Sequence, residues 1–419
     1  MIEKIAPLAA DAVEGLTTKV MTHCKYNENL RETQDVPDVV RVGDRFLVRV
    51  TRYDISGQPY ETYEARRRET IGDLYGKEFL KKVSTYEAAV IVPNHINYRQ
   101  VIGNCWNLYH KLDYKPASGI HAHWDELVSH IFGDKAHLGW DYLTLAYREP
   151  TQKLPVLILA SEENGTGKTT FGNALTFLFG RNAGFYTQDD LSSPFNSWMK
   201  SLFALFEEVS DAKLTLNKLK AISTAREATL NEKYLAQTPF QPFVKIIILS
   251  NNVKDVIKAN ENDKRYWIVK VPPLNKDEFL PDFNERLKDE VPAVMNTLAT
   301  RELSVPCRSR MWFDEELLKT DALATVIENT QSDAAKEIRL WVADILEQRP
   351  NGFGVNLSEL YQALGGKFKR TELRTALKEE LKVESSRTSY INHEGIRNNG
   401  QAFMFKRQAG LEPHEDLPF

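Results

Sequence analysis

The chain has 419 residues, of which 42% are hydrophobic and 27% are charged, which is enough for two or three domains with cores of their own. Its formal net charge of −4 excludes a polycation that coats nucleic acid indiscriminately, so any contact with nucleic acid has to be local. The three cysteines, Cys24, Cys105 and Cys307, are too few and too scattered for a disulfide framework or a metal site.

The apolar runs of the chain are short. The longest, PVLILA at 155–160 and VKIIILSNN at 244–252, have the length of strands and fall well short of the roughly 20 residues that a helix needs to cross a bilayer. The first residues, MIEKIAPLAADAVEG, carry acids among apolar positions and lack the basic start and long apolar stretch of a signal peptide. We therefore expect a cytoplasmic protein without membrane contact.

The N-terminal part of the chain predicts two regions. Residues 1–100 predict an α+β region of unknown role, with strand-like pieces at 45–53 and 88–96 and no catalytic signature. Residues 101–150 predict a helical collar, because 120–148 has the apolar spacing of two amphipathic helices.

The pattern changes after the collar. From 151 to 275, short β-rich runs alternate with longer amphipathic segments, which predicts an α/β fold with a largely parallel sheet and crossover helices. Residues 276–332 predict a helical connector, 333–407 a compact basic domain and 408–419 a flexible tail.

A strand, a glycine-containing loop and a helix follow one another in PVLILASEENGTGKTTFGNALTFLF, the order of a phosphate-binding P-loop. Gly165 and Gly167 let the backbone turn tightly, so that N–H groups point at phosphate oxygens. Lys168 would reach the β- and γ-phosphates, and Thr169 would offer its hydroxyl to Mg²⁺. The expected ATP contacts are Glu162, Glu163, Asn164, Gly165, Thr166, Gly167, Lys168, Thr169 and Thr170.

The loop departs from the strict pattern at one position. GxxxxGK[ST] requires its first glycine at 162, where this chain has Glu162. The GTGKTT segment remains specific, because a Gly-x-Gly-Lys-Thr run between a strand and a helix has few other physical uses. The alternative is a solvent-exposed turn that merely contains Gly and Lys.

Two further polar clusters follow strand-like runs. SLFALFEEVS (201–210) ends in Glu207, which would position Mg²⁺, and Glu208, which would activate the attacking water. By itself such an acid pair is more often a helix start or a solvated face. VKIIILSNN ends in Asn251, which would hold the γ-phosphate or the water, and in Asn252, which caps the turn in the alternative interpretation.

A basic pair precedes the next strand-like run, in NDKRYWIVKV (262–271). Near a subunit edge, the Arg265 guanidinium would reach the ATP of a neighbouring subunit as an arginine finger. The alternative, which applies to Lys264 with equal weight, is a surface basic pair beside a strand.

A phosphate loop, paired acids and an Asn at the end of the next core strand, in this order, resemble superfamily 3 helicases of small viruses, phages and plasmids. That family carries a DNA-gripping hairpin between the second and third of these motifs. The corresponding stretch here is TLNEKYLAQTPFQPF (229–243), with Lys233 and Tyr234, and the alternative for Lys233 is an exposed loop lysine. Upstream, Lys218, Lys220 and Arg226 add positive charge that would track phosphates.

The stretches NYRQVIGNCWNLYHKLDYKPASG and HWDELVSHIFGDK look like the primase-helicase proteins of phages and mobile elements, and the resemblance covers about 90–300. It implies an AAA+-like core, ATP and Mg²⁺ as cofactors, and a ring of six copies that moves on single-stranded or forked DNA. It implies the cytoplasm of a bacterial host if the gene is carried by a phage. It does not imply primase activity, since 1–100 lacks a zinc-ligand cluster and a convincing pair of primase carboxylates, so a separate primase or polymerase is a candidate partner.

Residues 333–407 predict a winged helix: helices at 334–348, 356–364 and 369–382, then two strand-like runs around an NNG turn. The third helix region carries six basic residues (Lys367, Lys369, Arg370, Arg374, Lys378, Lys382) against three acids (Glu372, Glu379, Glu380). Arg374 and Lys378 would lie along DNA, or else belong to a solvated face of a protein-docking domain.

Two other classes of function compete with a ring translocase. One is a DNA-binding initiator or regulator whose nucleotide site switches assembly without processive unwinding, and Glu162 in place of glycine keeps it open. The other is a small-molecule P-loop kinase, which ranks last because it would need neither an Asn sensor, nor a distant Arg, nor a DNA-like C-terminal module.

Overall fold

The computed structural model describes residues 38–53, 57, 59–207, 209, 218–219, 221–231, 238–252, 265–274 and 282–406. The chain forms two compact units, Met1–Val92 with Arg99–Leu108, and Pro93–Tyr98 with Tyr109–Phe419. Among the described residues, no helix has the length and apolar character that spanning a membrane requires.

The first unit contains a four-stranded sheet in the order β3-β2-β1-β4. Its strands are β1 (Val39–Val42), β2 (Arg45–Tyr53), β3 (Pro59–Arg66) and β4 (Ser84–Tyr86), and α2 (Arg68–Tyr75) and α3 (Lys77–Lys82) follow β3. Side chains alternate along β2, so Phe46 and Val48 face a core with Ile71 of α2. The 45–53 strand expected from the sequence is therefore confirmed.

The expected boundary at residue 100 is wrong. β5 (Ala88–Val90) and β6 (Val101–Ile102) both pair with β7 (Cys105–Asn107), so the unit continues to Leu108. The strand expected over 88–96 stops at Val90, because the backbone of Val92 bonds to the side chain of Asn107 instead of to a neighbouring strand. That side chain accepts from Val92 N at 3.0 Å and donates to Val92 O at 3.1 Å.

The second unit is built on a five-stranded sheet in which every pair of neighbours is parallel. The order is β14-β8-β13-β10-β9, with β8 (Val156–Ala160), β9 (Ala183–Tyr186), β10 (Phe203–Glu207), β13 (Lys245–Ser250) and β14 (Tyr266–Lys270). The α/β class and the parallel sheet expected from the sequence are confirmed, although β9 was not among the expected strands. The helix α6 (Lys168–Phe179) follows β8 and precedes β9.

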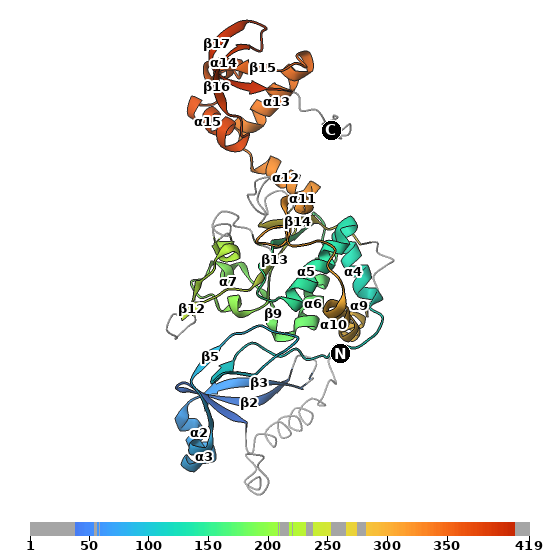
Figure 1. Ribbon diagram of the computed structural model, residues 1–419, viewed down its shortest axis with the longest axis vertical. Helices are drawn as coiled ribbons and strands as arrows, with labels where there is room; N and C mark the ends of the chain where they lie inside the picture. Colours follow the sequence, from blue (N-terminus) through green and yellow to red (C-terminus); the bar gives the residue numbers. More distant parts are fainter. Residues whose placement is uncertain are drawn as a thin grey trace, which may run out of the picture. The chain divides into compact units, whose positions relative to one another are not determined.

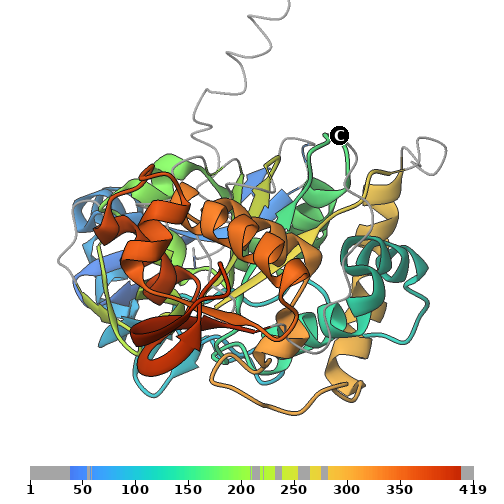
Figure 2. The same cartoon turned by 90° about the horizontal axis from the view of Figure 1, so that it is seen from above.

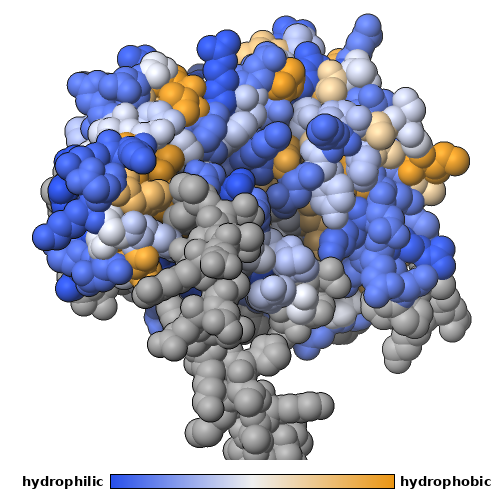
Figure 3. Space-filling model, turned by 90° about the horizontal axis from the view of Figure 1, so that it is seen from below, coloured by the Kyte–Doolittle hydropathy of each residue, from blue (hydrophilic) through white to orange (hydrophobic). Residues whose placement is uncertain are grey.

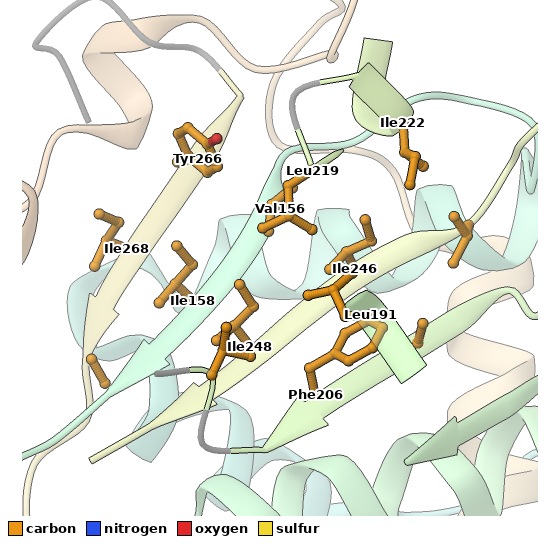
Figure 4. Packing of buried hydrophobic residues seen from close by; sticks show 14 of the residues in the cluster. Val156, Ile158, Leu191, Phe206, Leu219, Ile222, Ile246, Ile248, Tyr266 and Ile268 are labelled. Atoms are coloured by element: carbon orange, nitrogen blue, oxygen red, sulfur yellow. The ribbon is translucent and has the colours of Figure 1, made fainter. Parts of the chain in front are cut away.

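Helices cover both faces of this sheet, so its central strands carry continuous apolar runs rather than an alternating pattern. One face packs in a cluster that includes Ile158, Phe206 and Ile248 (Figure 4). Segments that cover it include α7 (Gln188–Ser192) and α12 (Asp321–Thr330), which contribute Leu191 and Leu323. The strands and these helices can be followed in Figure 1.

The helices α4 (Ala122–Phe132) and α5 (Ala136–Arg148) confirm the expected helix pair at 120–148, and they belong with α6 to the other side of the sheet. Phe132 of α4 stacks on Trp267 of β14, with ring centroids 4.9 Å apart. Gly172 lets α6 approach closely, because a Cβ there would lie 3.0 Å from Leu205 of β10.

The segment expected to be a connector is part of the core. α9 (Phe283–Asp289) and α10 (Val291–Thr300) pack against α5 and α6, and Leu287, Val294 and Leu298 are fully buried. Only α11 (Glu315–Leu318) and α12 continue the helical run before the C-terminal module. The face in Figure 3 shows small hydrophobic patches between hydrophilic residues.

The C-terminal module contains α13 (Asp333–Gln348), α14 (Leu357–Ala363) and α15 (Arg370–Thr375), followed by a π-helical turn at 376–380. Its sheet has the order β15-β17-β16, with β15 (Phe353–Val355), β16 (Ser385–Ile391) and β17 (Arg397–Phe405). Its helices and hairpin are visible in orange and red in Figure 2. The Asn356 side chain caps α14.

The turn expected at NNG is wrong, since these residues, 398–400, lie inside β17. The chain instead turns at 392–396, where the buried Asn392 side chain accepts from the backbone N–H groups of Glu394 and Ile396 at 3.1 and 2.8 Å. Gly395 supplies the left-handed φ of +91° that the turn requires. The Asx turn formed by Asn392 therefore sets the position of the hairpin turn, and the Gly/Asn composition of NNG does not.

Candidate active site

A cavity of about 530 Å³ lies where β8, β10 and β13 end. The register makes these ends level, because Glu207 pairs with Leu249, and Ser250 pairs with Ala160. Ligands of open parallel sheets bind outside the carboxyl ends of the strands, at the point where the strand order reverses. The strand order reverses at β8. The next strand in sequence, β9, lies at one edge of the sheet, and the last strand, β14, pairs with β8 on its other side. The cavity is lined by Asn164, Gly165, Thr166, Gly167, Lys168, Thr169, Thr170, Glu207, Leu249, Asn251 and Leu274.

The loop between β8 and α6 turns at two glycines. Gly165 has φ +70°, and Gly167, the N-cap of α6, has φ +87° and ψ −1°, a left-handed conformation that other residues adopt at a cost. Ser161 starts the loop and is almost fully buried. Its backbone N–H donates to Ser250 O at 3.1 Å, and its hydroxyl donates to Glu163 O at 2.7 Å. The loop is thus fixed to the end of β13 and presents the N-terminus of a 12-residue helix to the cavity.

Lys168 is the first residue of α6 and is 7% exposed. Its ammonium group donates to the hydroxyl of Ser161 and, at 3.1 Å, to that of Thr166. Loss of hydration on burial lowers the pKa of Lys168. Among the described contacts, the ammonium bonds only to neutral oxygens of its own loop. Its charge is therefore poorly hydrated and unneutralised, and an anion bound in the cavity would be attracted to it.

The hydroxyl of Thr169 donates to Glu207 Oε1 at 3.3 Å. These two side chains come from the start of α6 and the end of β10, and both are exposed to the cavity. A hydroxyl and a carboxylate are oxygen ligands of the kind that Mg²⁺ takes from proteins, together with water and phosphate oxygens. Both therefore fit the magnesium role expected for them. Among the described residues, no cluster of three or more His, Cys, Asp or Glu side chains forms a separate metal site.

Asn251 follows β13 and lines the cavity on the side of the loop, as expected. Asn252 does not line it. Its backbone N–H donates to the Ser250 hydroxyl at 3.1 Å, and that hydroxyl donates back to Asn252 O at 3.0 Å. Of the two residues, Asn251 is thus the one that lines the cavity, while Asn252 closes the turn through its backbone.

The structure does not bring every expected residue to the cavity. Glu162 and Glu163 are exposed and do not line it, and their expected contacts with ATP stay a prediction. Glu163 contributes its carbonyl, which accepts from the Ser161 hydroxyl and from Lys168 Nζ at 3.5 Å. Glu208 lies outside the described residues.

Arg265 lies at the opposite edge of the sheet. It precedes β14, and its carbonyl accepts from Val156 N at the start of β8. The five residues of β14 run from there towards the cavity, a separation of about 16 Å at the usual rise per residue. Arg265 therefore cannot reach the cavity of its own chain, and Lys264 lies outside the described residues.

The expected DNA-binding hairpin has two paired arms. β11 (Ala228–Leu230) and β12 (Thr238–Phe240) are antiparallel, with Leu230 opposite Thr238. Lys233 and Tyr234, in the segment that joins them, lie outside the described residues, as does Lys220. Arg226 is exposed just before β11.

Lys218 departs from its expected role. Its Nζ donates to Ser193 O at 2.6 Å, and loss of hydration lowers its pKa, so it stabilises a loop rather than presenting a solvated charge. Arg374 and Lys378 are exposed in the C-terminal module, at the end of α15 and in the turn after it.

Three residues of the site carry no sequence signal that pointed to them. Ser161 was visible only as the residue after a strand. Leu274 follows β14 and lines the cavity, but no motif in the sequence includes it. His130 of α4 meets the loop through a hydrogen bond between Nε2 and Thr166 O at 3.0 Å, across 36 residues of sequence.

The comparisons with known proteins concern the same region. A model described as a family of unknown function (DUF5906) matches residues 159–265, from β8 to the residue before β14. No curated protein matches the chain. The apo structure of the NrS-1 C-terminal region is similar to this chain, with a TM-score of 0.63 and 16% identity over 88% of this chain and 95% of that one. Two A-form apo structures of that region give TM-scores of 0.63 and 0.60 at 17% and 14% identity, covering 88% and 93% of this chain and 96% and 98% of theirs. At these identities the likeness concerns the fold.

Proposed function

We propose that the chain is a P-loop ATPase with an AAA+-like core that drives a DNA helicase or translocase of the superfamily 3 kind. The observation that carries this proposal is the convergence of Lys168, Thr169, Glu207 and Asn251 on one cavity at the carboxyl ends of three parallel strands. A solvated turn that merely contains Gly and Lys would not gather a carboxylate and an amide from two other strands.

Each group has a distinct task in phosphoanhydride hydrolysis. Backbone N–H groups at the start of α6 bind phosphate oxygens, and Lys168 neutralises the charge that grows on them. Thr169 and Glu207 would hold Mg²⁺, which would supply charge stabilisation for the phosphates. Asn251, which lines the cavity, would orient the attacking water or the terminal phosphate. Glu208, next to Glu207, remains the proposed general base.

The DNA-related part of the proposal rests on the paired arms of the β11–β12 hairpin, because Lys233 and Tyr234 fall between these arms in the sequence. A translocase of this kind needs several copies, and the distance of Arg265 from its own cavity is what a finger that serves a neighbouring subunit requires. We therefore include a homo-hexameric ring, ATP and Mg²⁺, and single-stranded or forked DNA in the proposal. A separate primase or polymerase remains the candidate partner.

The C-terminal module adds a second DNA-related element. Three helices and a β-hairpin support a winged helix, in which Arg374 and Lys378 would contact DNA or a partner protein. The α4–α5 pair corresponds to the proposed collar.

A nucleotide-switched initiator without unwinding is the second candidate, and Glu162 in place of the first glycine is the observation that favours it. The position of Glu162 weakens this candidate, because its side chain is exposed and does not line the cavity.

Unwinding of a forked DNA duplex by the intact protein with Mg-ATP separates the two candidates. A motor separates the strands, and Lys233→Ala abolishes separation while leaving ATP hydrolysis without DNA unchanged. Lys115→Ala, at an exposed lysine away from the cavity, is the matched control and unwinds normally. If the protein binds ATP and DNA but separates no strands, the switch is favoured and the motor is rejected.

A further inference from the structure

The β16–β17 hairpin of the C-terminal module has two different faces. The two strands pair without interruption along the whole of β16, so successive side chains point to opposite faces of the hairpin (Figure 1). One face holds the hairpin to the module. Tyr390 is buried on this face, and its ring occupies the space above Gly354 of β15, where a Cβ would lie 2.7 Å from Tyr390 Cδ2.

Hydrogen bonds fix the same face to the start of α14. The Tyr390 hydroxyl donates to the carboxylate of Glu359 at 3.1 Å and accepts from Asn356 Nδ2 at 3.1 Å. Asn398 of β17 donates to the same carboxylate at 2.7 Å. The hairpin is therefore held in place from one side, and its other face points away from these contacts.

The other face, which we call the wing face, consists of exposed side chains. They are Arg387, Ser389, Ile391, Arg397, Asn399 and Gln401. Arg397 Nε donates to Ser389 Oγ at 3.3 Å, which confirms that these two side chains lie on one face. No carboxylate belongs to the wing face, and none pairs with either guanidinium group among the described contacts.

The helix that would compete with the wing face for DNA carries mixed charge. α15 has six residues, and the exposed carboxylates of Glu372 and Glu379 accompany Arg374 and Lys378 in α15 and the turn after it. The same helix also borders a hollow of about 410 Å³ that three carboxylates line. Phosphates would be repelled there, so the positive charge of the hairpin is the better match for DNA.

The wing face fits a duplex better than a single strand. A two-stranded β-ribbon is one of the elements that the major groove of B-DNA admits. Guanidinium groups bind phosphates through paired hydrogen bonds, and the side chains of Ser389, Asn399 and Gln401 can donate to phosphate oxygens or base edges. Sites for single strands instead offer aromatic side chains on which bases stack, and the wing face has no aromatic residue.

We propose that the wing face is a second DNA-binding surface, separate from the β11–β12 hairpin, and that it holds duplex DNA through Arg387 and Arg397. The inference rests on the DNA part of the proposed function and deepens it, because it assigns the duplex to the β16–β17 hairpin and leaves the single strand to the motor. Binding at the wing face needs no nucleotide, since none of its residues lines the ATP cavity.

Fluorescence anisotropy tests this with the intact protein, without nucleotide, on a short labelled duplex and on one of its strands. The wing variant, Arg387→Ala combined with Arg397→Ala, should weaken duplex binding about 10- to 100-fold. It should also reduce the salt dependence, lowering the slope of log affinity against log salt by about 2, one for each phosphate contact. The matched control, Arg374→Ala combined with Lys378→Ala, removes the same charge from the α15 region and should bind the duplex as wild type does.

The inference is overturned if the wing variant binds the duplex as wild type does, if the control loses as much affinity, or if only single-strand binding falls. ATP hydrolysis without DNA separates this claim from the proposed function, because the wing variant should hydrolyse ATP normally. Hydrolysis by wild type without duplex binding rejects the wing face and leaves the motor. Duplex binding that depends on the two arginines, without hydrolysis, supports the wing face and rejects the motor.

Discussion

Gly167→Ala is the most direct test of the loop geometry. Gly167 has φ +87° and ψ −1°, and an L-residue in this left-handed conformation costs about 1–2 kcal/mol. The added Cβ would meet Cδ2 of His130 at 3.6 Å and Cδ1 of Leu274 at 3.8 Å, which are ordinary contacts, so backbone strain is the whole effect. Gly167 itself is only half-buried, so in the free protein the turn can relax at this residue while Ser161 stays fixed to β13. Binding of ATP requires the left-handed turn, so the cost should appear in ATP affinity, as a loss of about 5- to 30-fold.

Titration calorimetry with Mg-ATP measures this loss, and Gly103→Ala is the control. Gly103 also has a positive φ, +59°, with open space around its missing Cβ, and it lies in the β6–β7 turn of the first unit. The control should bind ATP as wild type does. An unchanged ATP affinity in Gly167→Ala would refute the argument that the left-handed turn sets the phosphate site.

Three further predictions concern metal, core and pH. Thr169→Ala should raise the Mg²⁺ concentration for half-maximal ATP hydrolysis by about 10- to 100-fold, and a normal Mg²⁺ dependence would contradict the Thr169–Glu207 site. Ile248→Ala, fully buried in β13, should lower the free energy of unfolding in urea by about 2–5 kcal/mol, whereas Leu340→Ala, 68% exposed, should change it by less than about 0.5 kcal/mol. Burial lowers the pKa of His95 from 6.5 to about 4, so the unfolded state takes up a proton first as the pH falls. Stability should be flat above about pH 6.5 and decrease towards pH 4, by at most about 1.4 kcal/mol per pH unit from this group. His95→Gln should flatten that slope in urea titrations, and a slope unchanged by the substitution would rule the group out.

The parallel sheet could be predicted because its strands are buried on both faces. The runs VLILA (156–160) and IIIL (246–249) are apolar at every position, and the polar residues that follow them mark the edge where a site can form. Gly165 and Gly167 marked the loop in the sequence, because glycine readily adopts the left-handed conformation that a tight turn requires. Lys168, Thr169, Glu207 and Asn251 were accordingly found from local patterns, and the fold placed them together.

Features that depend on partners far along the chain were not predicted. The lysine at 218 looked like a solvated charge, but its partner, Ser193 O, lies 25 residues away. His130 reaches the loop from a helix that the sequence marked only as amphipathic.

β9 was missed because it is short and only partly buried, so its residues have no continuous apolar pattern. The NNG turn was misplaced because composition favoured it, while a single buried side chain, Asn392, decided where the hairpin turns.

The measurement that tests the central claim most directly is phosphate release from Mg-ATP, with and without single-stranded DNA, by the intact protein, Lys168→Ala and Glu207→Gln. Lys115→Ala serves as a control for the loss of one positive charge. The account predicts that DNA stimulates turnover in wild type and the control, and that both site substitutions abolish it. Turnover that persists in Lys168→Ala would contradict the assignment of the cavity as the hydrolytic site.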